Sequence, residues 1–179
     1  MHQQENEGDF LSIPIDDIII KMIDYSAGNL HDIEHFLKVY TYAKAIGGKE
    51  LKDAGSKEAL ETAAILHDIA CPLCREKYGN TAGHLQELEG GPLCRDFLSS
   101  FDLPEDFIEK IIWLVSHHHT YTDVSLPEHQ ILLEADFLVN ASESHYSTER
   151  ILNAKNSFFR TACGIFMLDR IYLRPEDTL

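Results

Sequence analysis

Apolar residues recur at intervals of three or four positions along most of this chain, which is the spacing of amphipathic helices. The first such stretch follows Pro14 and ends at Gly28, a residue type that commonly terminates helices. Its predicted inner face consists of Ile15, Ile18, Ile19, Met22 and Ile23. A second helix is expected from about Asp32 to Ile46, where Gly47-Gly48 provides a stop. Its predicted inner face consists of Phe36, Val39, Tyr40, Ala43 and Ile46.

The remaining periodic stretches predict further helices. Ser56 is a plausible N-cap for a helix that continues to about Ala70, because Pro72 cannot lie in a helix interior. The helices expected after it run from Asn80 to Phe101 with a bend or break at Gly90-Gly91-Pro92, from Pro104 through Trp113 to His117-His118-His119, from Pro127 through Val139, and from about Asn156 to Tyr172. No stretch shows the alternation typical of a strand. We therefore predict an all-α protein, a bundle of about seven helices.

The chain of 179 residues is long enough for one domain with a substantial core. It contains no repeats and no long linker, so residues 1–12 are interpreted as a flexible N-terminal tail and residues 13–179 as a single domain. Its polar, acidic start lacks the features of a signal peptide. Its longest apolar runs are far shorter than the roughly 20 residues that span a bilayer. A cytoplasmic location is therefore expected.

The formal net charge is −15, from 15 Lys and Arg residues against 30 Asp and Glu residues. Such a surface repels nucleic-acid backbones and anionic lipids, so neither extended nucleic-acid binding nor membrane binding is expected. A small anionic substrate can still bind where a local cation, such as a metal ion, reverses the field. The sequence leaves a homodimer open.

The four cysteines are Cys71, Cys74, Cys94 and Cys163. Disulfides are not expected in a chain without an export signal. The CxxC formed by Cys71 and Cys74 is compatible with a zinc or redox role, but there is no second CxxC and no preceding strand. We interpret the cysteines as reduced and structurally incidental, with a peripheral zinc or redox role as the alternative.

Titratable residues occur inside three of the most apolar predicted helices. His35 lies in the second helix, His67-Asp68 in the third, and Asp136 in the run Ile131–Val139. A buried carboxylate needs a partner, and any one of these side chains alone is more often satisfied by backbone groups or an Arg. Lys and Arg are scarce near these segments, however. One divalent cation bound by all four side chains would satisfy them together, so a metal site is the better interpretation.

The order and context of these residues resemble the signature of the HD-domain superfamily of metal-dependent phosphohydrolases. The segments similar to the family's ligand motifs are His35-Phe36-Leu37-Lys38-Val39, Ala64-Ile65-Leu66-His67-Asp68-Ile69 and Leu133-Glu134-Ala135-Asp136-Phe137-Leu138. The resemblance covers roughly residues 30–145. It implies an HD-type helical bundle with the metal ligands His35, His67, Asp68 and Asp136 at its centre, in which Asp68 can bridge two metals.

Members of this family with binuclear centres supply extra histidines between the His-Asp pair and the final Asp. His84, His117 and His118 fall in this interval, and we expect them to bind a second metal. The alternatives are a polar helix end for the histidine run, where His suits the helix dipole, and another polar function for the segment around His84. His119 is expected at the pocket mouth. The surface is the expected location of His2, His31, His129 and His145.

The resemblance implies phosphoester hydrolysis. A metal polarises a phosphoryl oxygen and lowers the pKa of a bound water toward neutrality, while Asp68 would anchor the metal and accept a hydrogen bond from that water. Imidazole-rich ligation suits iron, zinc, manganese or nickel better than magnesium, and one or two such divalent ions are expected. The candidate phosphate clamps are Lys38, Arg75, Lys77 and Arg160. Lys38 and Arg160 are the catalytic candidates among them, since Arg160 follows apolar residues that would hold it near the core.

The sequence departs from several branches of the family. The residues after the histidine run, Thr120-Tyr121-Thr122, lack the Glu and the Gly-Tyr-Pro signature of the cyclic-dinucleotide phosphodiesterases. Ile69-Ala70-Cys71-Pro72 stands where alarmone hydrolases and nucleotidases place acidic residues, so their substrates cannot be carried over. We expect hydrolysis of a small phosphoester, such as a nucleotide or related metabolite. The alternatives are a di-iron oxygenase of the same fold and a non-catalytic metal-binding or regulatory module.

Overall fold

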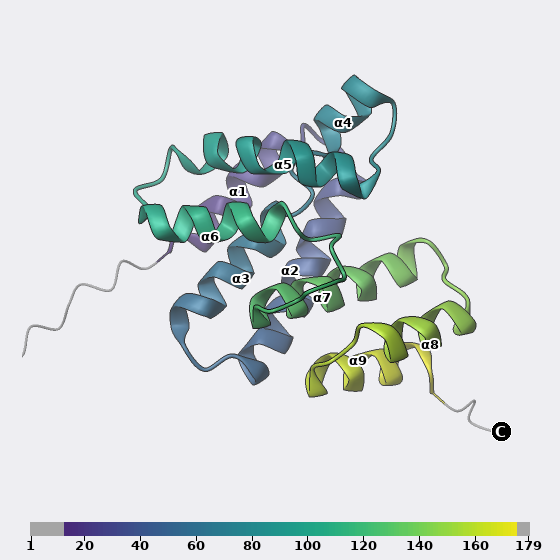
Figure 1. The fold of residues 1–179 in the computed structure, drawn as a ribbon. Coiled ribbons are helices and arrows are strands. Elements are labelled where there is room, and N and C mark those ends of the chain that lie inside the picture. The colour runs from purple at the N-terminus through teal and green to yellow at the C-terminus, as the bar shows by residue number, and fades with distance from the viewer. Residues whose placement is uncertain (1–12, 175–179) are drawn as a thin grey trace, which may run out of the picture.

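The computed structural model describes residues 13–174, and every regular element in that range is a helix. The helices are α1 (Ile15–Tyr25), α2 (Leu30–Glu50), α3 (Ala54–Leu66), α4 (Cys71–Tyr78), α5 (Gly83–Leu98), α6 (Glu105–Val115), α7 (Pro127–Glu143), α8 (Thr148–Ser157) and α9 (Ala162–Tyr172). The prediction of an all-α fold is confirmed, with nine helices in the described range rather than about seven (Figure 1). The predicted tail, residues 1–12, lies outside that range.

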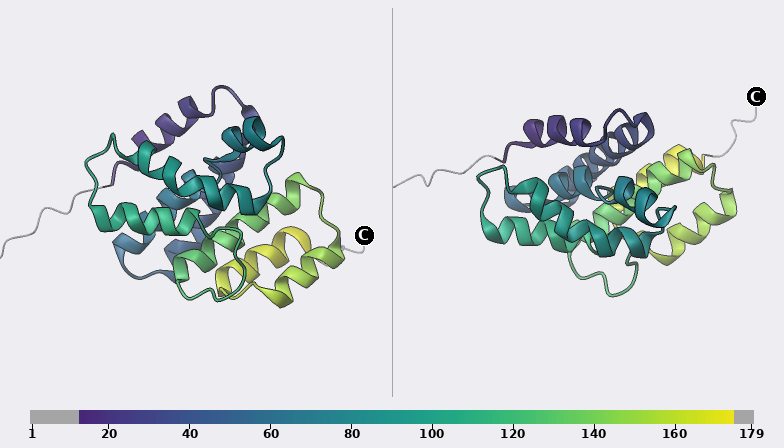
Figure 2. Two further views of the ribbon diagram at one scale, coloured as in Figure 1. Left: turned by 45° about the horizontal axis from the view of Figure 1, so that its top comes forward. Right: turned by 90° about the horizontal axis from the view of Figure 1, so that it is seen from above.

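Three helices form the centre of the molecule. α2, α3 and α7 contact one another; α1 and α6 pack on α3, and α5 pairs with α6 and α4. α8 and α9 pack as a pair, with α9 against α2 and α7, and this pair lies at the opposite end of the molecule from α1 (Figure 2). Side chains that point into the junction of α2, α3 and α7 are therefore shielded from solvent. Within residues 13–174, no helix combines the length and the apolar character needed to cross a membrane.

The core follows the apolar pattern closely in the central helices. Every residue from Ile131 to Val139 of α7 is buried. The predicted inner face of α2 is confirmed for Phe36, Val39, Ala43 and Ile46. In α1, Ile18 and Met22 are buried, whereas Ile23 is 38% exposed. Each buried Leu or Ile side chain stabilises the fold by about 1.5–3 kcal/mol, so this core can hold a few polar side chains in fixed positions.

Gly47 and Gly48 do not end α2, contrary to the sequence prediction. The helix continues to Glu50, and both glycines lie inside it. A Cβ atom at Gly47 would lie 2.6 Å from Leu60 Cδ2 of α3. The absence of a side chain therefore allows α2 and α3 to pack closely, and helix contact rather than helix termination explains this glycine.

Two other predictions about helix limits are wrong, one because of a capping hydrogen bond and one because of close helix packing. Asp53, not Ser56, caps α3, because its carboxylate accepts a hydrogen bond from the Ser56 backbone N–H at 2.7 Å. α5 is not broken at Gly90-Gly91-Pro92. A Cβ atom at Gly90 would lie 2.9 Å from Val115 Cγ1, so this glycine permits the close contact with α6.

The His67-Asp68 pair lies at the end of a helix rather than in its interior. α3 ends at Leu66, and residues 67–70 form a turn before α4. Pro72 lies in the first turn of α4, where a missing backbone N–H costs no hydrogen bond. The proline therefore helps to begin a new helix, and the turn in front of it presents the pair to the centre of the molecule.

The predicted last helix, from Asn156 to Tyr172, is in fact part of two helices, α8 and α9. The helix is interrupted between Ser157 and Ala162. There the backbone N–H groups of Arg160 and Thr161 donate to the buried Glu134 carboxylate, at 2.6 and 2.9 Å. These N–H groups are thereby diverted from a helical ladder. No Gly or Pro marks the break, so the apolar spacing alone could not locate it.

Candidate metal centre

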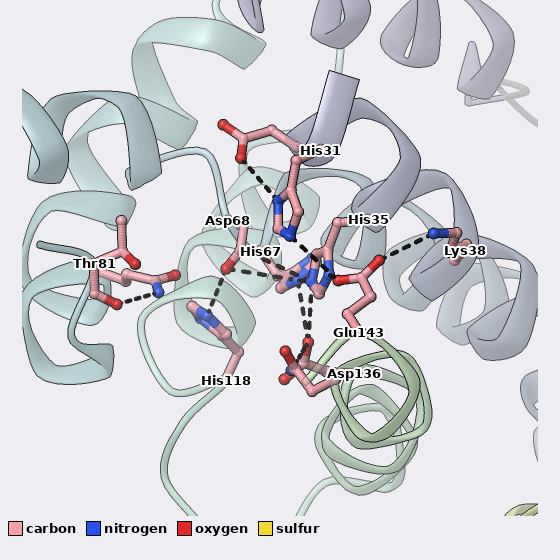
Figure 3. Close-up of polar contacts among 12 residues, drawn as sticks. His31, His35, Lys38, His67, Asp68, Thr81, His118, Asp136 and Glu143 are labelled. Atoms are coloured by element: carbon pink, nitrogen blue, oxygen red, sulfur yellow. Dashed lines mark hydrogen bonds and ion pairs between the residues drawn. The ribbon is translucent and has the colours of Figure 1, made fainter. Parts of the chain in front are cut away.

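Four polar side chains converge at the junction of α2, α3 and α7 (Figure 3). α2 supplies His35, the turn after α3 supplies His67 and Asp68, and α7 supplies Asp136. The side chain of His67 is fully buried, and those of His35 and Asp136 are 5% and 3% exposed. The Asp68 side chain is 24% exposed, so it is the member of the group that faces outward.

The distances among these side chains suit ligands of a single ion. His35 Nε2 lies 3.2 Å from His67 Nε2, 3.2 Å from Asp136 Oδ1 and 3.5 Å from Asp68 Oδ2. His67 Nε2 lies 3.5 Å from Asp136 Oδ1 and 3.6 Å from Asp68 Oδ1. Two ligand atoms held at about 2.1 Å from one ion are roughly 3.0 Å apart at a right angle and roughly 3.4 Å apart at a tetrahedral angle.

The outer nitrogens of three imidazoles all have acceptors, which sets their tautomers. His35 Nδ1–H donates to Glu143 Oε2 at 2.8 Å, and His67 Nδ1–H donates to the Ala64 carbonyl at 2.9 Å. His118 Nδ1–H donates to the Val115 carbonyl at 2.6 Å. In each ring the Nε2 lone pair then points inward, which is the tautomer that a metal-binding histidine adopts.

These inward lone pairs face carboxylate oxygens, so a proton or a cation must lie between them. His118 Nε2 is buried and forms no hydrogen bond to any residue in 13–174, although Asp68 Oδ1 lies 3.4 Å away. Buried polar atoms without a partner are rare in folded proteins. A set of imidazole nitrogens and carboxylate oxygens fits a divalent transition metal.

The charges of the group act strongly on one another. Burial alone would lower the pKa of His35, but its contact with Asp136 and the charge of Asp68 raise it to about 10. Burial would raise the pKa of both aspartates, but the neighbouring imidazoles lower the pKa of Asp68 and of Asp136 well below the ordinary range. Positive charge is therefore strongly favoured at this point, whether a proton or a metal provides it.

Asp68 also belongs to a second group, with His118 and His119. One ligand atom from each of these residues lies within 4.8 Å of the others. His119 Nε2 is buried and has no hydrogen-bond partner among the described residues. Burial, together with the charge of His118, lowers the pKa of His119 to about 4, so the neutral imidazole has a lone pair available at pH 7. Asp68 is common to both groups of candidate ligands.

The structure places two of the residues predicted for a second metal outside both groups. His84 is exposed on α5. His117 Nδ1–H donates to the Trp113 carbonyl at 2.7 Å, and its ring stacks on the indole with the centroids 4.3 Å apart. Because α6 has ended before the histidine run, the next two histidines, His118 and His119, face the site instead.

A cavity of about 400 Å³ lies over the two groups, and we call it the metal cavity. Its volume lies within the range of roughly 300–1,000 Å³ typical of small-molecule sites. Its walls include Asp68 and Asp136, aromatic and amide side chains, and the two arginines Arg75 and Arg150. A small molecule in this cavity would be in contact with the exposed side of Asp68.

Two of the predicted phosphate clamps lie close to the metal cavity. Arg75 lines it, but its guanidinium pairs with the Asp32 carboxylate. Lys38 Nζ lies 3.1 Å from Glu143 Oε1, on the carboxylate whose other oxygen accepts from His35. Both cations are therefore already paired with acids of this region.

The other two predicted clamps neither line the metal cavity nor pair with a residue that lines it. Lys77 Nζ lies 2.7 Å from Glu89 Oε1. The Arg160 guanidinium donates to the backbone carbonyls of Phe159, at 2.7 Å, and Ser157, at 2.5 Å. The apolar residues before Arg160 thus hold it against backbone rather than against the site.

Glu143 and Arg150 are among the residues of the metal cavity that sequence reasoning missed. Glu143 could have been found, because Asp136, Asn140 and Glu143 follow the spacing of one helical face, and Asn140 Nδ2 donates to Asp136 Oδ1 at 2.8 Å. Arg150 gave no such signal. It lies in α8, which begins at Thr148, whereas the sequence predicted no helix between Val139 and about Asn156.

The remaining histidines include one correction. His129 was expected on the surface but is only 1% exposed, because its Nε2–H donates to the His117 carbonyl at 2.7 Å and its ring packs edge-on against Trp113. His145 is exposed as expected. The His31 side chain is 72% exposed and lies at the rim of the metal cavity. His2 lies outside the described residues.

All four cysteines are free, as expected. Cys71 lines the metal cavity, where burial and the charge of Asp68 raise the pKa of its thiol. Within residues 13–174, neither group of candidate metal ligands contains a cysteine. The CxxC therefore contributes no ligand to the sites described above.

Comparison with known families identifies one relationship. A family model for the HD domain matches residues 30–141, which includes both candidate ligand groups. No curated protein and no solved structure matches the chain.

Proposed function

The chain belongs to the HD domain family, and from that premise we propose that it is a metal-dependent phosphohydrolase acting on a phosphoester of a small molecule, such as a nucleotide or a related phosphorylated metabolite. Members of this family are mostly phosphohydrolases. The observation that carries the proposal is the convergence of His35, His67, Asp68 and Asp136, whose ligand atoms lie 3.2–3.6 Å from one another in the pairs measured above.

We assign a first divalent cation to these four side chains and a second to Asp68, His118 and His119, with Asp68 shared. The imidazole-rich donor set suits iron, zinc, manganese or nickel better than magnesium. When bound, such ions would polarise a phosphoryl oxygen and lower the pKa of a water molecule toward neutrality. This assignment replaces His84 and His117 of the sequence prediction with His119, because His84 is exposed on α5 and the His117 ring is stacked on Trp113, outside both groups of candidate ligands.

The protein's own side chains would orient the reaction. Asp68 is the proposed catalytic residue, since its carboxylate faces the metal cavity and can accept a hydrogen bond from the attacking water. Glu143 fixes the ring of His35, and Lys38 holds Glu143, so Lys38 is a positioning residue in this proposal. Arg160 has no part in it, because its guanidinium is bonded to backbone carbonyls.

The test is release of inorganic phosphate from a panel of phosphorylated metabolites, with protein purified anaerobically and loaded with each metal in turn. Asp68→Ala is expected to abolish both metal retention and phosphate release, because it removes a ligand of both ions. Asp17→Ala, on the exposed face of α1, is the control and should behave as wild type. Wild-type activity in Asp68→Ala would refute the site.

Two other outcomes would replace the proposed reaction. Oxygen consumption by the iron-loaded protein, without phosphate release, would indicate a di-iron oxygenase of the same fold. Metal retention with no turnover of any compound would indicate a non-catalytic metal-binding module.

A further inference from the structure

A second cavity of about 430 Å³ adjoins the metal cavity, and we call it the side cavity. Its apolar walls come from Tyr121, Phe137, Tyr146 and Phe158. The residues that line both cavities are Tyr121, Asn140, Tyr146 and Arg150. Because the two cavities share these walls, one small molecule can extend from the metal centre into the side cavity.

The aromatic rings of the side cavity form a continuous wall. The ring centroids of Tyr121 and Phe158 are 4.7 Å apart, those of Phe158 and Phe137 are 5.3 Å apart, and those of Phe137 and Tyr146 are 5.5 Å apart. The rings are tilted or edge-on to one another, the geometry that aromatic pairs favour. Tyr121 is 42% exposed, so part of this wall is open to a ligand. Such a wall suits a flat ring.

Arg150 stands at the junction of the two cavities. The central carbon of its guanidinium lies 3.4 Å from the ring centroid of Tyr146. No acidic side chain among the described residues pairs with Arg150, whereas Arg75, the other arginine of the metal cavity, is paired with Asp32. The guanidinium over the Tyr146 ring has no acidic partner among the described residues, and its planar set of N–H donors matches the oxygens of a phosphate.

We propose that the side cavity is a specificity subsite: it binds a planar aromatic group on the alcohol portion of the phosphoester, while Arg150 binds an oxygen of the phosphate. This inference rests on the proposed function. The match to the HD domain ends at residue 141, so Tyr146, Arg150 and Phe158 lie outside the part of the chain that the family model covers. Tyr121 and Phe137 lie within the matched range, so the subsite combines residues of the matched domain with residues that follow it.

Binding of adenosine and ribose to the metal-loaded protein tests the side cavity without any ester to cleave. Calorimetry is expected to show that adenosine binds and that ribose binds at least about tenfold more weakly, since stacking of a base on an aromatic side chain contributes about 1–3 kcal/mol. Phe158→Ala and Tyr121→Ala should each weaken adenosine binding by about fivefold or more. Phe166→Ala, which alters a 60% exposed ring outside both cavities, is the control.

Hydrolysis tests Arg150 and the link between the cavities. The value of kcat/KM should be higher for AMP than for ribose 5-phosphate, and Arg150→Ala should lower it for both substrates by a similar factor. Arg150→Lys should restore only part of the loss, because it keeps the charge without the planar donors. Arg170→Ala is the matched control, since the Arg170 guanidinium also lies over an aromatic ring, that of Phe166, but lines neither cavity.

The subsite is overturned if adenosine and ribose bind equally, or if both Phe158→Ala and Tyr121→Ala keep wild-type affinity for adenosine. The role of Arg150 is overturned if Arg150→Ala hydrolyses both substrates as wild type does. If no ester releases phosphate but adenosine binding responds to the aromatic variants as expected, the proposed hydrolase fails while the aromatic subsite stands.

Discussion

Replacing Glu143 with Gln tests how the ligand His35 is held in place. The Glu143 carboxylate accepts the His35 Nδ1–H at 2.8 Å and lies 3.1 Å from Lys38 Nζ. Burial would raise the pKa of Glu143, but these two contacts lower it, so the group is ionised at pH 7. Glu143→Gln keeps the shape and an acceptor oxygen but removes the charge that makes His35 a stronger donor to a metal.

The expected loss follows from the change in this hydrogen bond. A bond to a charged partner contributes about 1.5–3 kcal/mol and a neutral one about 0.5–1.5 kcal/mol. The difference of about 1–1.5 kcal/mol corresponds to roughly tenfold in metal affinity. Glu143→Ala leaves the His35 Nδ1–H without this acceptor, and up to roughly 100-fold is expected, the range found when the outer partner of a metal-binding histidine is lost.

The assay is competition for the metal with a chromophoric chelator, followed by kcat/KM at saturating metal. Glu34→Gln is the matched control, because Glu34 also contacts Lys38, at 3.5 Å, but its exposed carboxylate forms neither a hydrogen bond nor an ion pair with His35. The reasoning is refuted if Glu143→Gln binds metal as tightly as wild type, or if Glu34→Gln weakens binding as much.

Two further predictions concern pH and the second ligand group. Burial alone would lower the pKa of His35, but its contacts with Asp136 and Asp68 raise this pKa from 6.5 to about 10. Protonation of His35 therefore stabilises the folded protein. This stabilisation is fully present below about pH 6.5 and is lost as the pH rises through 10. Thermal unfolding of the chelator-treated protein should therefore show a falling Tm between about pH 7 and pH 10, and the metal-loaded protein should show a smaller fall. In Gly83→Ala, the new Cβ would lie 2.7 Å from ring carbons of His119. Displacement of that ring should lower the metal stoichiometry, measured by elemental analysis, from two ions toward one.

Gly48→Ala controls for the general effect of replacing a helical glycine. A Cβ atom there meets no atom within 4 Å, so the variant should keep its metals and gain about 0.5–1 kcal/mol of stability from the better helix propensity of Ala. An equal metal content in Gly83→Ala and Gly48→Ala would contradict the assignment of His119. A Tm that is independent of both pH and metal would contradict the prediction for His35.

The helical class and the four convergent side chains were predictable because they depend on local pattern. His35, His67, Asp68 and Asp136 each interrupt an apolar stretch, and such interruptions need a common explanation whatever the details of packing. The family resemblance predicted from the same residues is confirmed over residues 30–141.

The predictions that were wrong, on helix limits and on the second group of ligands, concern features that depend on contacts between distant segments. Gly47 could not be distinguished from a helix stop without knowing that Leu60 packs against it. The break between α8 and α9 depends on Glu134, more than 20 residues earlier in the chain. The choice of His119 rather than His117 depends on where α6 ends relative to Trp113, and no spacing rule determines that position.

α8 and the residues next to it follow the matched domain and supply part of the wall of the side cavity. The candidate metal ligands all lie before residue 141, while Tyr146, Arg150 and Phe158 follow it. Under the proposed subsite, substitutions in this later stretch would change which compound is accepted while the candidate metal ligands stay intact. Exchange of that short segment between related chains offers a direct route to altered substrate preference.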